Sequence, residues 1–163
     1  MTRLRAALTA LALAVTVLLT GCSQGAPTTT AIVNGSTISE STVDAATTQY
    51  LALAGGDWST TRALVARQYV LGTASRQVAA DKGIPLSTAK SDTKIATYPQ
   101  IAELIALGDD LGDVKKALST DEFAAAMNGV GVTLNPRYGS WKVYSDMTIT
   151  ALPTGSLSET ANR

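Results

Sequence analysis

Residues 59–85 read STTRALVARQYVLGTASRQVAADKGIP, and they contain the longest helical periodicity in the chain. One apolar stripe recurs at spacings of three and four residues, which places its members on a single helix face: Ala63, Ala66, Val70, Ala74 and Val78, flanked by Leu64 and Leu71. Gly83 supplies a C-terminal stop, and Pro85 follows it. The pattern predicts a helix from about Ser59 to Lys82 with its apolar face against a core.

A shorter helix is predicted before this long one. Ser39 is a favourable N-cap residue, and Gly55-Gly56 supply the stop. Helical spacing places four apolar residues on one face of this segment: Val43, Ala46, Tyr50 and Leu53.

Helical patterns also fill the chain after Ser87. Four segments are expected in order: a weak helix from Ser87 to about Ala96, a helix from Pro99 that ends or kinks at Gly108, a short helix with Leu111, Val114 and Leu118, and a last helix ending at Asn128-Gly129. Ser119 and Glu122 match a capping box at the start of the last one. The residues expected to be buried are Ile101, Leu104 and Ile105, and the last helix contains Phe123 and Met127.

β signals occur only at the two ends of this helical region. Ala31-Ile32-Val33 runs into Asn34-Gly35, which readily accepts the positive φ angles of tight turns. Val130, Val132 and Leu134 alternate with Gly131 and Thr133, as strand residues do. The sequence therefore predicts a mainly α fold with minor β-segments near 31–33 and 130–144.

The amino-acid composition excludes several classes of activity and partner. The 163 residues carry 13 Lys and Arg against 13 Asp and Glu, with no His and one Cys. The absence of His excludes catalysis by imidazole and metal sites built on His, and one Cys cannot form an internal disulfide. No basic run exceeds Lys115-Lys116, so no nucleic-acid partner is expected. We find no nucleophile motif, and we expect neither an enzyme nor a cofactor or metal site.

The first twenty-two residues indicate export and lipidation. Arg3 and Arg5 precede an apolar stretch from Ala6 to Leu19, which is typical of a signal peptide covering residues 1–21 and too short for a permanent span. Directly after it, Leu19-Thr20-Gly21-Cys22 resembles the bacterial lipobox, in which the cysteine thiol is alkylated by diacylglycerol. We expect an acylated Cys22 that holds the protein in membrane lipid on the extracytoplasmic face. The alternative is an ordinary secretory signal with an incidental cysteine.

The rest of the mature chain divides into three parts. Residues 22–30 form a small, polar, lipidated tether, whose eight residues after the cysteine reach at most roughly 30 Å. Residues 31–150 form the folded domain. Residues 151–163 are polar and small, and they are expected to form a flexible tail.

Two clusters are candidate binding sites. Tyr138, Trp141 and Tyr144 lie within seven residues and could stack on a sugar or peptide, although packing of a strand against the helices is the favoured interpretation. An acidic cluster lies at Asp109, Asp110 and Asp113. It lacks the ligand spacing of a calcium loop, so we interpret it as a solvated helix N-terminus.

Three stretches together carry a family resemblance. Residues 31–44, AIVNGSTISESTVD, resemble the opening of the N-terminal domain of SurA-like and PrsA-like extracytoplasmic chaperones. Residues 82–87, KGIPLS, are similar to the end of the long helix in that family. Residues 134–141, LNPRYGSW, are similar to the Asn-Pro-Arg-Tyr/Phe-Gly segment of actinobacterial members.

This resemblance implies that the first and last β-segments pair into a two-stranded sheet and that the helices form a lobe holding unfolded or exported polypeptides. The chain has neither the length nor the histidines of the parvulin isomerase domain that many relatives carry. The expected function is chaperone-like binding without isomerase activity. The alternatives are an adaptor lipoprotein that docks one dedicated envelope protein, or a small-ligand binder that uses an exposed Tyr138, Trp141 and Tyr144 cluster.

Overall fold

Four helices and a small antiparallel sheet make up the described part of the protein. The computed structural model describes residues 28–87 and 97–144. The elements in chain order are β1 (Thr29–Val33), β2 (Ser36–Ser39), α1 (Glu40–Ala54), α2 (Trp58–Lys82), α3 (Pro99–Ala117), α4 (Thr120–Gly129), β3 (Val132–Leu134) and the 3-10 turn η1 (Pro136–Tyr138). The mainly α prediction is confirmed.

Several predictions concern residues outside this description. They are the signal peptide of residues 1–21, the lipobox with Cys22, residues 23–27 of the tether, nearly all of the weak helix from Ser87 to Ala96, and the tail of residues 151–163.

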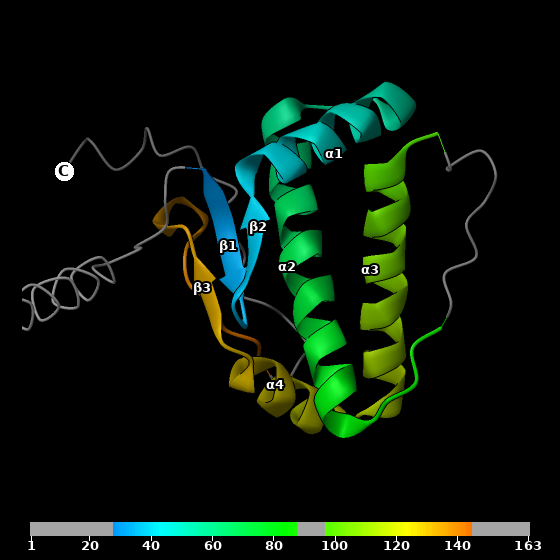
Figure 1. Ribbon diagram of the computed structural model, residues 1–163, viewed down its shortest axis with the longest axis vertical. Helices are drawn as coiled ribbons and strands as arrows, with labels where there is room; N and C mark the ends of the chain where they lie inside the picture. The colour runs from blue at the N-terminus through cyan, green and yellow to red at the C-terminus, as the bar shows by residue number, and fades with distance from the viewer. Residues whose placement is uncertain (1–27, 88–96, 145–163) are drawn as a thin grey trace, which may run out of the picture.

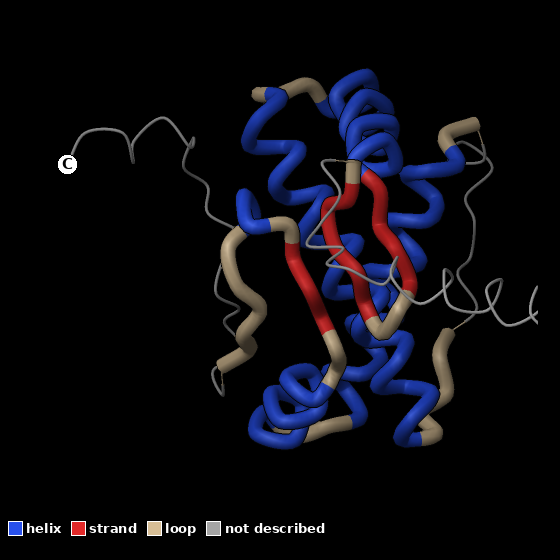
Figure 2. Tube along the Cα trace, turned by 60° about the vertical axis from the view of Figure 1, so that its left-hand side comes forward, coloured by secondary structure: helices blue, strands red, loops and turns tan. Residues whose placement is uncertain are grey.

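The helices are arranged around α2. In Figure 1, α2 and α3 run side by side in the same direction, α1 crosses their upper end, and α4 lies near their lower end. The sheet lies on the side of α2 away from α3. Figure 2 shows the three strands against the helices. α2 thus contacts every layer of the fold.

The ends of α2 are close to their predicted positions. Asp57 is the N-cap residue, and its carboxylate accepts a hydrogen bond from the Thr60 amide at 2.9 Å. At the other end Gly83 adopts φ 65°, a left-handed conformation that glycine accepts without steric cost. The predicted stripe is largely correct, because four of its members are buried: Ala66, Val70, Ala74 and Val78.

α3 differs from the prediction. It is continuous from Pro99 to Ala117, so the expected end or kink at Gly108 and the separate helix around Leu111 are wrong. Leu107 and Val114, which lie on either side of Gly108, are both buried in the core. Burial of two such side chains contributes about 3 kcal/mol or more. That outweighs the roughly 1 kcal/mol by which a glycine weakens a helix interior.

α2 and α3 approach each other very closely at Gly72. A Cβ atom on Gly72 would lie 2.4 Å from the Cβ of Leu107 and 2.8 Å from its carbonyl oxygen. Only glycine permits this separation, and the contact fixes the spacing of the two helices.

The sheet has the strand order β2-β1-β3. β1 and β3 pair antiparallel, with Ala31 opposite Leu134 and Val33 opposite Val132, so the predicted pairing of the first and last β-segments is correct. The prediction of only two strands is wrong. Asn34 and Gly35 take φ 46° and 84° and close a hairpin, which adds Ser36–Ser39 as a third strand before α1. β1 also begins at Thr29, two residues before the predicted domain boundary.

The core joins the sheet and all four helices, and the predicted core is only partly correct. Ile101 and Leu104 are buried as expected, and Phe123 and Met127 of α4 are also part of the core. Ile105 is instead exposed, and Tyr50 and Leu53, which share the predicted apolar face of α1 with the buried Val43 and Ala46, are exposed too. Within residues 28–87 and 97–144, none of the helices combines the length and apolarity needed to cross a bilayer.

Candidate functional site

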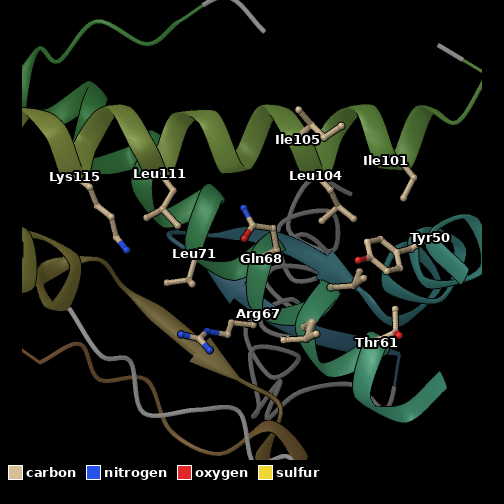
Figure 3. A pocket seen from close by; sticks show the side chains of 12 residues that line it. Tyr50, Thr61, Arg67, Gln68, Leu71, Ile101, Leu104, Ile105, Leu111 and Lys115 are labelled. Carbon is tan, nitrogen blue, oxygen red and sulfur yellow. The ribbon is translucent and has the colours of Figure 1, made fainter. Parts of the chain in front are cut away.

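An open groove of about 520 Å³ lies between α2 and α3. Figure 3 shows Tyr50 and Ile101 near one end and Leu111 and Lys115 near the other. Most of the lining is apolar: Tyr50 from α1, Leu64, Val65 and Leu71 from α2, and Ile101, Leu104, Ile105 and Leu111 from α3. The polar lining residues are Thr61, Arg67, Gln68 and Lys115.

Large apolar side chains at this groove remain in contact with water. Leu64 is 57% exposed, Tyr50 44% and Ile105 41%, and each comes from a different helix. Isolated exposed apolar residues are ordinary on protein surfaces, but a group that lines one groove is typical of a binding surface. The floor beside them is packed, since Val65, Leu71 and Leu104 are buried. The groove is therefore a formed surface with an apolar rim.

The sequence patterns do not indicate this groove. The periodicity puts Leu64 at the flank of the apolar stripe of α2, Tyr50 on the apolar face of α1, and Ile105 in the core. The available signal is weak: Leu104 and Ile105 are adjacent and lie about 100° apart on the helix, which is the width of an ordinary core-facing stripe. Which of the two is exposed depends on how α3 is rotated against α2, and Gly72 and Leu107 fix that rotation.

Two cations lie on the wall of the groove. The Nε atom of Arg67 is buried without a hydrogen-bond partner among the described residues. The ammonium of Lys115 lies 5.6 Å from the ring centroid of Phe123. No described lining residue is acidic. The groove thus combines apolar surface with positive charge that no lining carboxylate neutralises.

A different cation, Arg62, is surrounded by acceptors on the sheet side of α2. Its guanidinium donates to Glu40 and to Asp44, with 2.6 Å between Nε and Oδ1 of Asp44, and also to the Tyr138 hydroxyl. That hydroxyl in turn donates to Glu40 at 2.8 Å. We call these four residues the Arg62 cluster. It joins α1, α2 and η1, and it ties the chain after β3 to the helical lobe.

Burial and charge shift two pKa values in the Arg62 cluster. Burial, together with the hydrogen bond to Glu40, raises the pKa of Tyr138 above its usual range, although Arg62 opposes the shift. Burial alone lowers the pKa of Arg62, but hydrogen bonds to Asp44 and Glu40 outweigh it and raise the pKa overall. Arg62 therefore stays charged and Tyr138 stays protonated, which suits a structural cluster.

The predicted aromatic cluster divides between interior and surface. Tyr138 is buried in the Arg62 cluster, and Trp141 is part-buried with its indole N–H donating to the Met127 carbonyl at 3.1 Å. Tyr144 is 40% exposed. The small-ligand alternative requires all three rings to be exposed, and the ring of Tyr138 is not.

The acidic residues Asp109, Asp110 and Asp113 lie in the body of α3 and not at a helix N-terminus, so that interpretation is wrong. Asp110 is buried and pairs with Arg76 at 2.5 Å. Asp113 accepts a hydrogen bond from the Ser87 amide at 2.7 Å, and hydrogen bonding to the Ser87 side chain and backbone lowers the pKa of its carboxyl. No group of three Asp, Glu, His or Cys side chains suited to a metal ion occurs in the described ranges.

The chain matches no family model, no curated protein and no solved structure.

Proposed function

We propose that this protein is a lipoprotein, anchored through acylated Cys22 to the extracytoplasmic face of the cell membrane, whose helical lobe binds apolar segments of unfolded or exported polypeptides. It acts by binding alone, without isomerase or other catalytic activity. The observation that carries the proposal is the α2–α3 groove, because its exposed Tyr50, Leu64 and Ile105 are available to cover apolar client side chains.

The sequence supports the location of this activity. The lipobox at Leu19-Thr20-Gly21-Cys22 precedes the first residue of β1, Thr29, by only a few residues. A tether of that length keeps the groove within a few nanometres of the membrane surface, where exported chains emerge. The resemblance to SurA-like and PrsA-like chaperones favours the same function.

The test is suppression of aggregation by the full mature lipoprotein in vesicles. Several unrelated envelope proteins are diluted from denaturant, and light scattering is followed with and without a molar excess of the lipoprotein. We expect slower aggregation of every client. Protection of one client alone would favour the adaptor alternative, and protection of none would overturn the proposal.

A matched pair of variants assigns the activity to the groove. Leu64→Gln removes an apolar side chain from the groove, whereas Leu53→Gln removes one of similar exposure, 53%, that lies outside it. Both changes affect mostly exposed side chains, so stability should stay within about 0.5 kcal/mol of the parent. We expect Leu64→Gln to weaken protection and Leu53→Gln to leave it unchanged. Equal effects would place client binding elsewhere.

A further inference from the structure

The charge pattern of the groove differs from that of the surrounding lobe. Three other cations pair with carboxylates: Arg62 with Glu40 and Asp44, Arg76 with Asp110, and Lys116 with Asp113. Arg67 and Lys115 form no ion pair with any described residue, although both line the groove. No carboxylate of the described chain neutralises the positive charge at this apolar surface. The surface therefore favours a ligand that carries a carboxylate.

The two cations are also separated from the most apolar end of the groove. In Figure 3 the guanidinium of Arg67 and the ammonium of Lys115 lie toward one end, while Tyr50 and Ile101 lie toward the other. Leu104 lies between these ends on α3. A ligand seated along the groove would therefore place apolar groups near α1 and an anionic group nearer the C-terminal half of α3.

The shape of the groove favours a polypeptide over an acyl chain. Sites for small apolar ligands enclose most of the ligand surface. Here Leu64 and Ile105 on opposite walls are both exposed, so the groove is open along its length. An extended segment can enter such a groove from the side without a path into an enclosed cavity.

We infer that the groove selects apolar polypeptide segments that carry an acidic side chain or a C-terminal carboxylate beside the apolar residues, with Arg67 and Lys115 binding the carboxylate. This inference rests on the proposed function, and it names the class of client that the site prefers. Apolar contact supplies the affinity, and the two cations supply the preference.

The test compares three labelled peptides that share one apolar core and are flanked by Asp, Gln or Lys. Binding to the full mature lipoprotein in zwitterionic vesicles is measured by fluorescence anisotropy at low and high salt. We expect the Asp peptide to bind roughly fivefold more tightly than the Gln peptide, since one or two partly exposed charge pairs supply that much. High salt should reduce the difference.

Variants at the two cations identify the groups responsible. Arg67→Gln and Lys115→Gln should each weaken binding of the Asp peptide more than binding of the Gln peptide, and so remove part of the preference. Lys116→Gln is the control, because Lys116 is mostly exposed, pairs with Asp113 and does not line the groove.

Each outcome separates this inference from the proposed function. If all three peptides bind with equal affinity, the groove binds polypeptides but the charge preference is wrong. If no peptide binds and no client is protected, the proposed function fails as well. Binding of a free fatty acid through Arg67, with no binding of any peptide, would overturn the inference in favour of a lipid ligand.

Discussion

Arg62 and Arg67 lie five residues apart on the same helix, yet their surroundings are opposite. Arg62 faces Glu40, Asp44 and Tyr138, and its charge is satisfied within the fold. Arg67 lines an apolar groove with no carboxylate beside it. On the sheet side of α2, the charge of Arg62 is thus paired within the chain. On the groove side, apolar surface and positive charge remain available to a partner.

The strongest test of this difference exchanges each arginine for methionine, which keeps much of the apolar stem. Arg62→Met leaves Glu40 without its cation, so we expect a loss of about 2–3 kcal/mol in the free energy of unfolding. This is somewhat below the value for a fully buried pair, because Arg62 is 18% exposed. Arg67→Met removes a buried Nε that has no hydrogen-bond partner among the described residues, so it should not lower the free energy of unfolding. Urea unfolding followed by circular dichroism measures both.

In peptide binding, the two variants should show the reverse order of effect. Arg67→Met should lose part of the preference for acidic peptides, whereas folded Arg62→Met should retain all of it. If Arg67→Met destabilises the protein as strongly as Arg62→Met does, Arg67 is a structural residue. The proposed contrast between the two sides of α2 then fails.

A smaller effect is expected at the contact that fixes the groove walls. Gly72→Ala places a methyl group against the backbone and side chain of Leu107, where nothing flexible can yield. We expect a loss of about 1–3 kcal/mol from overpacking, measured by urea unfolding, with altered client binding because α3 must shift.

Gly112→Ala is the matched control for Gly72→Ala. Gly112 lies within α3, and a Cβ there meets nothing within 4 Å. Alanine is the better helix former, so this variant should gain up to about 1 kcal/mol. Destabilisation by both variants to a similar degree would mean that helix propensity, and not the close approach at Gly72, controls the result.

The smallest effect concerns stability at low pH. Protonation of carboxylates that accept hydrogen bonds at helix N-termini should weaken the fold. Hydrogen bonds from Ser119 lower the pKa of Glu122, and those from Ser59 and Thr60 lower the pKa of Asp57. Because these pKa values are lower in the folded state, their stabilising contribution is complete above the unfolded values of 4.5 and 3.8 and is lost as the pH falls through the folded ones. Thermal unfolding should therefore occur at a lower temperature at pH 3 than at pH 6. Glu122→Gln should reduce that difference, and an unaltered difference would exclude this cap as a contributor.

Local patterns in the sequence predicted much of the fold. Ser39 caps α1, Ser119 and Glu122 form the predicted capping box, and β1 pairs with β3. The two caps depend on neighbouring residues, whereas the strand pairing, which joins residues far apart in the chain, was implied by the family resemblance and not by a local pattern. The errors arise where tertiary contact overrides a local rule: Gly108 suggested a helix end, but burial on both sides of it keeps α3 continuous.

The candidate site could not be predicted in the same way. Helical spacing indicated that Leu64 and Ile105 lie on apolar faces, but their exposure depends on the rotation of α2 against α3. The partners of Arg62 come from positions 18, 22 and 76 residues away, and the lack of a partner at Arg67 depends on the same packing. No sequence pattern indicates which of two nearby arginines receives a carboxylate.

The most direct test of the central claim is photo-crosslinking from the groove. p-Benzoyl-phenylalanine replaces Ile105 in the groove, or Leu53 or Tyr144 outside it, all of which are exposed to a similar degree. Each lipoprotein, in vesicles, is irradiated with the Asp-flanked apolar peptide and analysed by mass spectrometry. We predict a crosslink from position 105 and little from positions 53 and 144. Crosslinking from position 53 or 144 at least as strong as from position 105 would contradict the assignment of the α2–α3 groove as the binding surface.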